Sequence, residues 1–279
     1  MNYTIGNFCF RLILPEEITP PEHFEIFRGG TEPEFTYTVR LTDQLPPPEG
    51  KVIARRDDLL VTACAGGECR WIGVRGQAAP YACYRELSRQ EAEVLLIRER
   101  VSHLHIDPVF TSLLALERHL IRRDGLILHC AYMVYEGSAI LFSAPSETGK
   151  TTQANLWERT RGSRTVNGDR SLLQCVNGVW TARGWPVCGS SEVCHNEDFP
   201  IRAIVMLSQE KVDKAEPMTP VQAFSQVLSQ ITMNKWNRKA SVHVMDLTEQ
   251  LTAAVPVFHL GCTMEETAVE ALEKVLPAK

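Results

Sequence analysis

The chain of 279 residues is long enough for one large domain or two smaller ones, and it can bury a substantial core. Its apolar content of 44% and charged content of 23% are those of a soluble globular protein, without an apolar run that could cross a bilayer. The formal net charge of −5, with no block of Lys and Arg, argues against a nucleic-acid binder. The first residues lack a basic segment followed by an apolar one, so we expect no signal peptide and a cytoplasmic protein.

The first hundred residues are predicted to be rich in β-strands. Strand-like stretches are separated by turn signals of Pro and Gly, and they cover residues 8–14, 35–41, 59–63, 69–74 and 81–85. This spacing predicts a small antiparallel sheet in an N-terminal domain of residues 1–98. The stretch carries no chemical motif, so we expect it to recognise a substrate or to pack against the rest of the chain.

The nine cysteines raise the question of a metal site or of disulfides. No pair has the Cys-x-x-Cys spacing of a zinc site, and the count is odd. Cys64 with Cys69, and Cys188 with Cys194, are loose candidates. Scattered reduced thiols are the interpretation that we favour for a cytosolic fold.

The clearest helix signal begins at Asp107, a good N-cap, with Pro108 at the first helical position. Apolar residues recur at helical spacing from Val109 to Leu120, and Gly125 can adopt a left-handed cap conformation. The sequence therefore predicts one helix here, near the start of a second domain of residues 99–279.

The central motif of the second domain is a strand, a loop and a helix in that order. Residues 138–143 are strand-like, residues 144–149 form the loop, and good helix formers follow Lys150. This is the context in which backbone N–H groups and a helix N-terminus bind phosphate, with Lys150 on the terminal phosphates and Thr151 on Mg²⁺. Ala144 stands where the first glycine of a Walker A loop usually lies. The alternative is an ordinary β–α turn with an exposed lysine.

Further elements complete the second domain. Strands are predicted at 126–134, 201–207 and 257–260, and a hairpin of 171–176 with 179–183 turns at Asn177-Gly178. Helices are predicted from Thr219 as N-cap, over 238–252, and after a capping box at 263–266.

Asp169 and His129 are the candidate partners of Lys150. Asp169 follows the strand after the loop helix, where a second acidic group of a phosphate-loop enzyme binds Mg²⁺ or activates the attacking hydroxyl. It could instead cap local backbone groups in an Asn-Gly-Asp turn. His129 lies one strand from the loop and could exchange protons with a ligand, or it could be a core residue.

Four segments together resemble the HPr serine kinase/phosphatase family, and more closely its short bacterial relatives. They are Gly125–His129, Ser146–Thr151, Val166–Arg170, and Gly184–Ser191 before the strand 203–207. The resemblance covers about residues 107–275. It implies a mixed α/β fold shared with phosphoenolpyruvate carboxykinases, here with a small β-rich N-terminal domain. Those relatives include kinases that phosphorylate a serine of a ribosomally made peptide.

The resemblance also implies roles for individual residues. Asp169, His129 and Lys150 match catalytic positions, and Thr151 and Asp169 match the metal ligands. The nucleotide, ATP with Mg²⁺, would be bound by Ser146, Glu147, Thr148, Gly149, Lys150, Thr151 and Thr152. The HPr kinases carry a pair of acidic residues here, and the first of them, commonly taken as the catalytic base, is replaced by Gly168 in this chain. Whether Asp169 alone both binds the metal and acts as the base stays open. Glu147 stands where many relatives have glycine, and it places a carboxylate beside the phosphate site.

The sequence therefore predicts a transferase that moves the γ-phosphoryl group of ATP to a hydroxyl on a peptide, a protein or a small metabolite. A catalytically weak nucleotide-binding sensor is the alternative. The phosphate donor, which could be GTP or pyrophosphate, and the acceptor stay open. We expect no nucleic-acid or membrane partner, and a homo-oligomer is left open.

Overall fold

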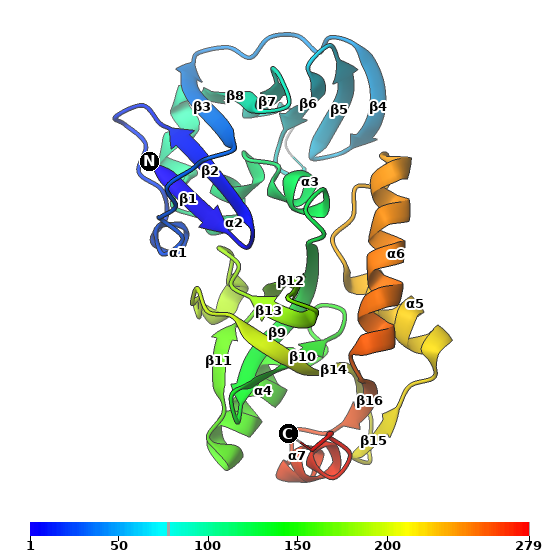
Figure 1. The fold of residues 1–279 in the computed structure, drawn as a ribbon. Helices are drawn as coiled ribbons and strands as arrows, with labels where there is room; N and C mark the ends of the chain where they lie inside the picture. Colours follow the sequence, from blue (N-terminus) through cyan, green and yellow to red (C-terminus); the bar gives the residue numbers. More distant parts are fainter. Residues whose placement is uncertain (77–78, 279) are drawn as a thin grey trace. The chain divides into compact units, whose positions relative to one another are not determined.

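The computed structural model describes residues 1–76 and 79–278. They form two compact units, one from Met1 to His119 and one that begins at Leu120, with the elements labelled in Figure 1. The sequence places the boundary after residue 98, whereas residues 99–119 belong to the first unit. Packing explains this, because the Phe110 ring lies 4.8 Å from that of Phe24, and the His119 ring stacks 5.1 Å from that of Phe8.

The first unit contains an eight-stranded sheet in the order β1-β2-β3-β8-β7-β6-β5-β4. The strands are β1 (Asn2–Ile5), β2 (Phe8–Ile13), β3 (Phe35–Thr42), β4 (Lys51–Arg56), β5 (Leu59–Cys64), β6 (Gly67–Ile72), β7 (Ala82–Glu86) and β8 (Glu91–Ile97). The predicted antiparallel sheet is wrong in part, since β3 pairs in parallel with both β2 and β8. Long connections allow this pairing: α1 (Glu22–Glu25) lies between β2 and β3, and four strands lie between β3 and β8.

The helical part of the first unit differs from the single helix predicted after Asp107. It consists of η1 (Arg98–His103), α2 (Asp107–Ser112) and α3 (Leu116–Ile121), with a break at Ala115, where φ is 47°. Residues 113–116 are all buried. The left-handed conformation of Ala115 turns the chain there, between α2 and α3. The predicted cap is also wrong, because Asp124 and not Gly125 has the positive φ, 57°.

A group of buried charges joins the sheet of the first unit to α3. Arg70, 5% exposed, donates to Glu68 and to Glu117, each at 2.6 Å. Arg118 donates to Glu68 at 2.7 Å and also to Glu86. Each of the three carboxylates has a guanidinium partner, which offsets the cost of removing it from water.

The second unit contains a mixed sheet in the order β10-β9-β12-β13-β14-β16-β15. The strands are β9 (Leu126–Tyr135), β10 (Ser138–Ser143), β11 (Arg164–Asn167), β12 (Arg170–Val176), β13 (Val179–Arg183), β14 (Phe199–Gln209), β15 (Lys214–Pro217) and β16 (Val257–Cys262). β11 pairs with β9, and β14 pairs in parallel with both β10 and β16. The carboxyl ends of β10, β14 and β16 therefore lie at one edge of the sheet.

Two hydrophobic clusters cover the two faces of this sheet. One contains side chains of α4 (Lys150–Arg161) and α7 (Glu266–Glu273), including Ala154, Trp157, Val269 and Leu272. The other contains side chains of α5 (Pro220–Gln230) and α6 (Arg238–Ala254), including Val227, Val244 and Leu251. The architecture is a mixed α/β unit with helices on both faces.

Several local predictions for the second unit are confirmed. The hairpin turns at Asn177 and Gly178 with φ of 51° and 83°, and Thr219 and Gln222 form a capping box at α5. The capping box predicted at 263–266 is wrong, because Glu265 precedes α7 and Thr263 instead bonds Asp213. In the described residues, none of the helices combines the length and the apolar character of a membrane span.

Replacing Arg70 by methionine tests the buried charge group. We expect the free energy of unfolding to fall by about 3–5 kcal/mol, because the substitution removes one of the two guanidinium groups that compensate the buried carboxylates. Chemical denaturation measures it. The control is Arg85→Met on the neighbouring strand, whose half-exposed pair with Glu93 is worth at most about 1 kcal/mol. Equal losses in the two variants would contradict this account of the buried group.

Candidate functional site

The turn between β10 and α4, residues 144–149, has the backbone of a tight loop before a helix. Gly149, the residue before α4, has φ of 109°, a left-handed value that glycine adopts at little steric cost. Glu147 also has a positive φ, 66°, and Ala144 is fully buried. The first N–H groups of α4 have no carbonyl partner within the helix, so they are available to an anion.

Lys150 begins α4, and its side chain folds back over this turn. The ammonium group donates to the carbonyl oxygens of Ala144 at 3.0 Å and of Pro145 at 3.1 Å. Burial lowers the pKa of Lys150 below its ordinary value, while the negative charge of Asp169 acts in the opposite direction. The lysine charge is therefore held at the loop and within electrostatic reach of Asp169.

The other predicted loop residues lie around the same turn. Ser146, Glu147 and Thr151 are exposed, and Thr152 is half-buried. The Thr148 hydroxyl donates to the Pro145 carbonyl at 2.9 Å. In the described part of the chain, no hydrogen bond joins Thr151 to Asp169, so the two expected metal ligands are not in direct contact.

Asp169 lies between His129 and Arg170. One carboxylate oxygen is 3.7 Å from His129 Nε2, and the other is 3.0 Å from Arg170 Nε. The register of β9 with β12 produces this arrangement, because His129 and Arg170 are directly paired across the two strands. The other imidazole nitrogen, Nδ1, is 3.4 Å from Gln230 Oε1, and Arg170 also donates to Thr232 Oγ1 at 3.1 Å.

Asn167, which the sequence did not single out, holds the turn that carries Asp169. Its side-chain oxygen accepts from the backbone N–H groups of Asp169 at 2.9 Å and Arg170 at 3.0 Å. Its amide nitrogen donates to the carbonyls of Trp185 and Val187. Asn167 therefore caps the N–H groups of this turn, and the Asp169 carboxylate interacts with His129 and Arg170 instead. The Asn-Gly-Asp sequence contained this signal, since Asn side chains bond backbone two residues on.

Burial and nearby positive charges favour the neutral form of the His129 imidazole. Burial lowers the pKa of His129 from its ordinary value of 6.5, and the positive charges of Lys150 and Arg170 lower it further. The Asp169 carboxylate and the bond with Gln230 raise the pKa without cancelling this shift. At neutral pH the imidazole can therefore accept a proton.

Gly168 has no room for a side chain in this turn. A Cβ atom there would lie 2.1 Å from the Ser191 hydroxyl oxygen and 2.4 Å from the Ser191 Cβ. Ser191 belongs to η2 (Gly189–Ser191), and its hydroxyl donates to the Cys188 carbonyl at 2.7 Å. An acidic side chain at this position would require η2 to move.

A family model described as "SynChlorMet cassette protein ScmC" matches residues 98–277 of the chain. Among solved structures, the HPr(Ser) kinase/phosphatase from Coxiella burnetii aligns with 12% identity over 53% of this chain and 90% of that chain, with a TM-score of 0.31. At that TM-score we draw no conclusion about the site from the alignment. No curated protein matches the chain.

Titration of His129 by NMR tests the electrostatics of the site. We expect Asp169→Asn to lower the imidazole pKa further, because it removes a negative charge that raises it, and Lys150→Met to increase it. Lys274→Met, at an exposed lysine beside Glu273, which accepts from Arg161 at the C-terminal end of α4, is the control and should leave the titration unchanged. Wild-type stability should fall as the pH drops below about 6.5, because the unfolded chain then binds a proton that the folded site disfavours. Shifts of the opposite sign would contradict the described geometry.

Proposed function

The chain belongs to the ScmC family of SynChlorMet cassette proteins, and we propose that its second unit is a kinase that transfers the γ-phosphoryl group of ATP to a hydroxyl. The acceptor would be a serine or threonine of a peptide or protein, or a small metabolite. Such a protein would be a phosphate-loop transferase of the HPr kinase type.

The observation that supports this function is the meeting of three charged or titratable groups at one sheet edge. Lys150 comes from the N-terminus of α4, His129 from β9, and Asp169 from the turn before β12. Lys150 lowers the pKa of His129, and Asp169 raises that of Lys150, so the three groups share one electrostatic site. Positive charge beside a base suits the attack of a hydroxyl on a phosphate.

Each residue has a role in this reaction. Lys150 would exchange its two loop carbonyls for phosphate oxygens, beside the N–H groups of residues 146–152. Neutral His129 would accept the proton of the acceptor hydroxyl, and the Asp169 carboxylate would stabilise the imidazolium that forms. As the acceptor oxygen bonds to the γ-phosphorus, the bond to the β–γ bridging oxygen breaks and ADP leaves.

The donor set also suits Mg²⁺. A hydroxyl from Thr151 and a carboxylate from Asp169 are hard oxygen ligands, and a nucleotide site usually adds waters and phosphate oxygens. Bound there, Mg²⁺ would neutralise charge on the phosphates. Arg170, 3.0 Å from Asp169, holds the carboxylate until then.

A nucleotide-binding sensor with little turnover is the second candidate. The contact of Gly168 with Ser191 favours it, because the site has room for one acidic residue and not two. The exposed carboxylate of Glu147 beside the phosphate loop points the same way, since it would repel a triphosphate.

Replacing Lys150 by alanine tests nucleotide binding. We expect the Kd for ATP–Mg²⁺, measured by isothermal titration calorimetry, to rise about tenfold to a hundredfold, because charge-assisted hydrogen bonds to phosphate are lost. Lys274→Ala removes an exposed lysine beside Glu273, which accepts from Arg161 at the C-terminal end of α4, and should leave the Kd unchanged. Equal affinity of the Lys150 variant and wild type would end the assignment of a phosphate loop.

Single-turnover transfer from labelled ATP to a library of hydroxyl acceptors separates the kinase from the sensor. We expect His129→Ala and Asp169→Asn each to reduce transfer by about 10²–10⁴-fold, the usual contribution of a general base. Melting temperatures of both variants control for folding. ATP binding without transfer, insensitive to Asp169→Asn, would favour the sensor.

A further inference from the structure

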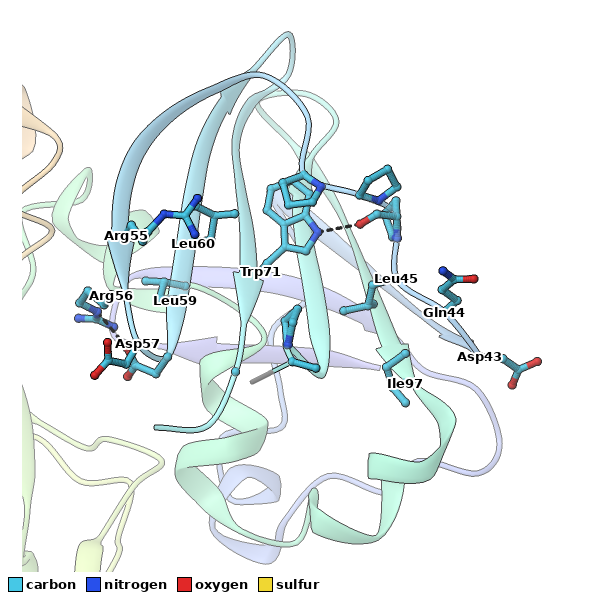
Figure 2. A pocket seen from close by; sticks show the side chains of 17 residues that line it. Asp43, Gln44, Leu45, Arg55, Arg56, Asp57, Leu59, Leu60, Trp71 and Ile97 are labelled. Atoms are coloured by element: carbon cyan, nitrogen blue, oxygen red, sulfur yellow. Dashed lines mark hydrogen bonds and ion pairs between the residues drawn. The ribbon is translucent and has the colours of Figure 1, made fainter. Parts of the chain in front are cut away.

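Among the residues that the structure describes, the groove of the first unit favours no particular class of ligand. Its walls include Leu45, Leu60, Trp71 and Ile97, and its volume is about 550 Å³. Trp71 already donates from Nε1 to the Pro46 carbonyl at 3.0 Å, as Figure 2 shows. Arg55 and Asp57, which also line the groove, carry opposite charges. The hydrogen bonds around His129 of the second unit, in contrast, have a definite direction.

The C-terminal end of α5 is fixed beside His129. Ile231, directly after the helix, forms a β-bridge with Leu128, and the Thr232 N–H group donates to the carbonyl of the residue before Leu128 at 2.9 Å. Both contacts are to β9, the strand that carries His129. They bring the side chain of Gln230, the last residue of α5, to the imidazole, where its Oε1 lies 3.4 Å from Nδ1.

A chain of hydrogen bonds orients the Gln230 amide. The Ser229 hydroxyl donates to the backbone carbonyl of Gln226 at 2.6 Å, a bond that uses its single hydrogen. The Ser229 oxygen can then only accept, and it lies 3.1 Å from Gln230 Nε2. The amide nitrogen of Gln230 therefore faces Ser229, and the amide oxygen faces His129. Because this oxygen can only accept, the hydrogen of the bond between Gln230 and His129 must lie on Nδ1.

The surroundings of the other ring nitrogen, Nε2, agree with this assignment. The Asp169 carboxylate oxygen that faces it is 3.7 Å away, which is longer than a hydrogen bond. The second oxygen of Asp169 is 3.0 Å from Arg170 Nε, so the carboxylate is held on the side of the guanidinium group. A neutral imidazole carries one ring hydrogen, so a hydrogen on Nδ1 leaves a lone pair on Nε2. The side of His129 that faces Asp169 therefore accepts a proton and does not donate one.

We propose that Gln230 is a positioning residue that holds His129 in the Nδ1–H tautomer and makes Nε2 the proton acceptor of the site. Gln230 acts through the imidazole, as the partner of the ring nitrogen that does not react. If the second unit is the kinase proposed above, on which this part rests, the O–H bond of the acceptor breaks and an Nε2–H bond forms. The Gln230 oxygen then holds one N–H group of the imidazolium, the Asp169 carboxylate faces the other, and the proton later passes to water.

Nitrogen-15 NMR of the histidine rings tests the tautomer in the full chain without nucleotide, at about pH 8.5, where an imidazole is neutral. Nε2 couples through two bonds to both carbon-bound ring protons and Nδ1 to only one, so the spectrum distinguishes the two nitrogens. The signals that disappear in His129→Gln belong to His129. We expect its Nε2 to resonate as the unprotonated nitrogen and its Nδ1 as the protonated one.

Substitutions of Gln230 test its part in this choice. Gln230→Leu should move the ratio of the two tautomers about threefold to tenfold toward Nε2–H, because the acceptor of the Nδ1 hydrogen is lost. Gln230→Glu, whose two oxygens only accept, should keep the wild-type tautomer. The control, Gln226→Leu, makes the same change at an exposed position one turn earlier in α5 and retains the backbone carbonyl that Ser229 uses. It should keep the wild-type spectrum.

Three results would overturn the proposal: a protonated Nε2 in the wild type, an unchanged tautomer ratio in Gln230→Leu, or an equal change in Gln226→Leu. Thermal unfolding checks that each variant is folded, and the wild-type spectrum decides the tautomer even if Gln230→Leu does not fold. Because the NMR experiment contains no nucleotide, its failure leaves the ATP titration of Lys150→Ala unaffected, and the two proposals fail separately.

Discussion

The candidate site depends on four hydrogen bonds made by one buried amide. Asn167 ties the turn before β12 to the segment 185–187 on one side and to the backbone of Asp169 and Arg170 on the other. Because Asn167 fixes this backbone, the Asp169 carboxylate faces His129 and Arg170 and does not cap the local N–H groups. A buried amide with all its bonds satisfied is costly to move, because each lost partner leaves a desolvated polar group. The position of the acid relative to the loop before α4 is therefore set by the core and not by the exposed turn.

The two units compensate their buried charged groups in different ways. In the first unit, two arginines pair with three carboxylates between the sheet and α3, and each carboxylate accepts from a guanidinium group. In the second unit, Lys150 donates to two carbonyl oxygens, and burial together with the charges of Lys150 and Arg170 lowers the pKa of His129. Polar groups with such replaceable partners are typical of sites that exchange protons or bind anions.

Local sequence signals predicted much of the second unit. The Asn177-Gly178 turn, the Thr219 cap and the strand–loop–helix around Lys150 each depend on residues close in sequence, and the structure has all three elements. The features that could not be predicted depend on contacts between residues far apart in sequence. The parallel strands of the first unit and the break at Ala115 follow from which residues the core buries, and the contacts of Gln230 and Thr232 follow from tertiary folding. The Asn167 side chain makes bonds of both kinds: two are to the nearby backbone of Asp169 and Arg170, and two are to the distant carbonyls of Trp185 and Val187.

The contact between Gly168 and Ser191 links two positions of the chain that are far apart in sequence. Since even a methyl group on residue 168 would overlap Ser191, a side chain at one position leaves no volume for a side chain at the other. A relative that carries a carboxylate at the first position must therefore reshape the segment around the second. Across such sequences these two positions should vary together, and either position considered alone would give a misleading estimate of the number of acidic residues at this turn.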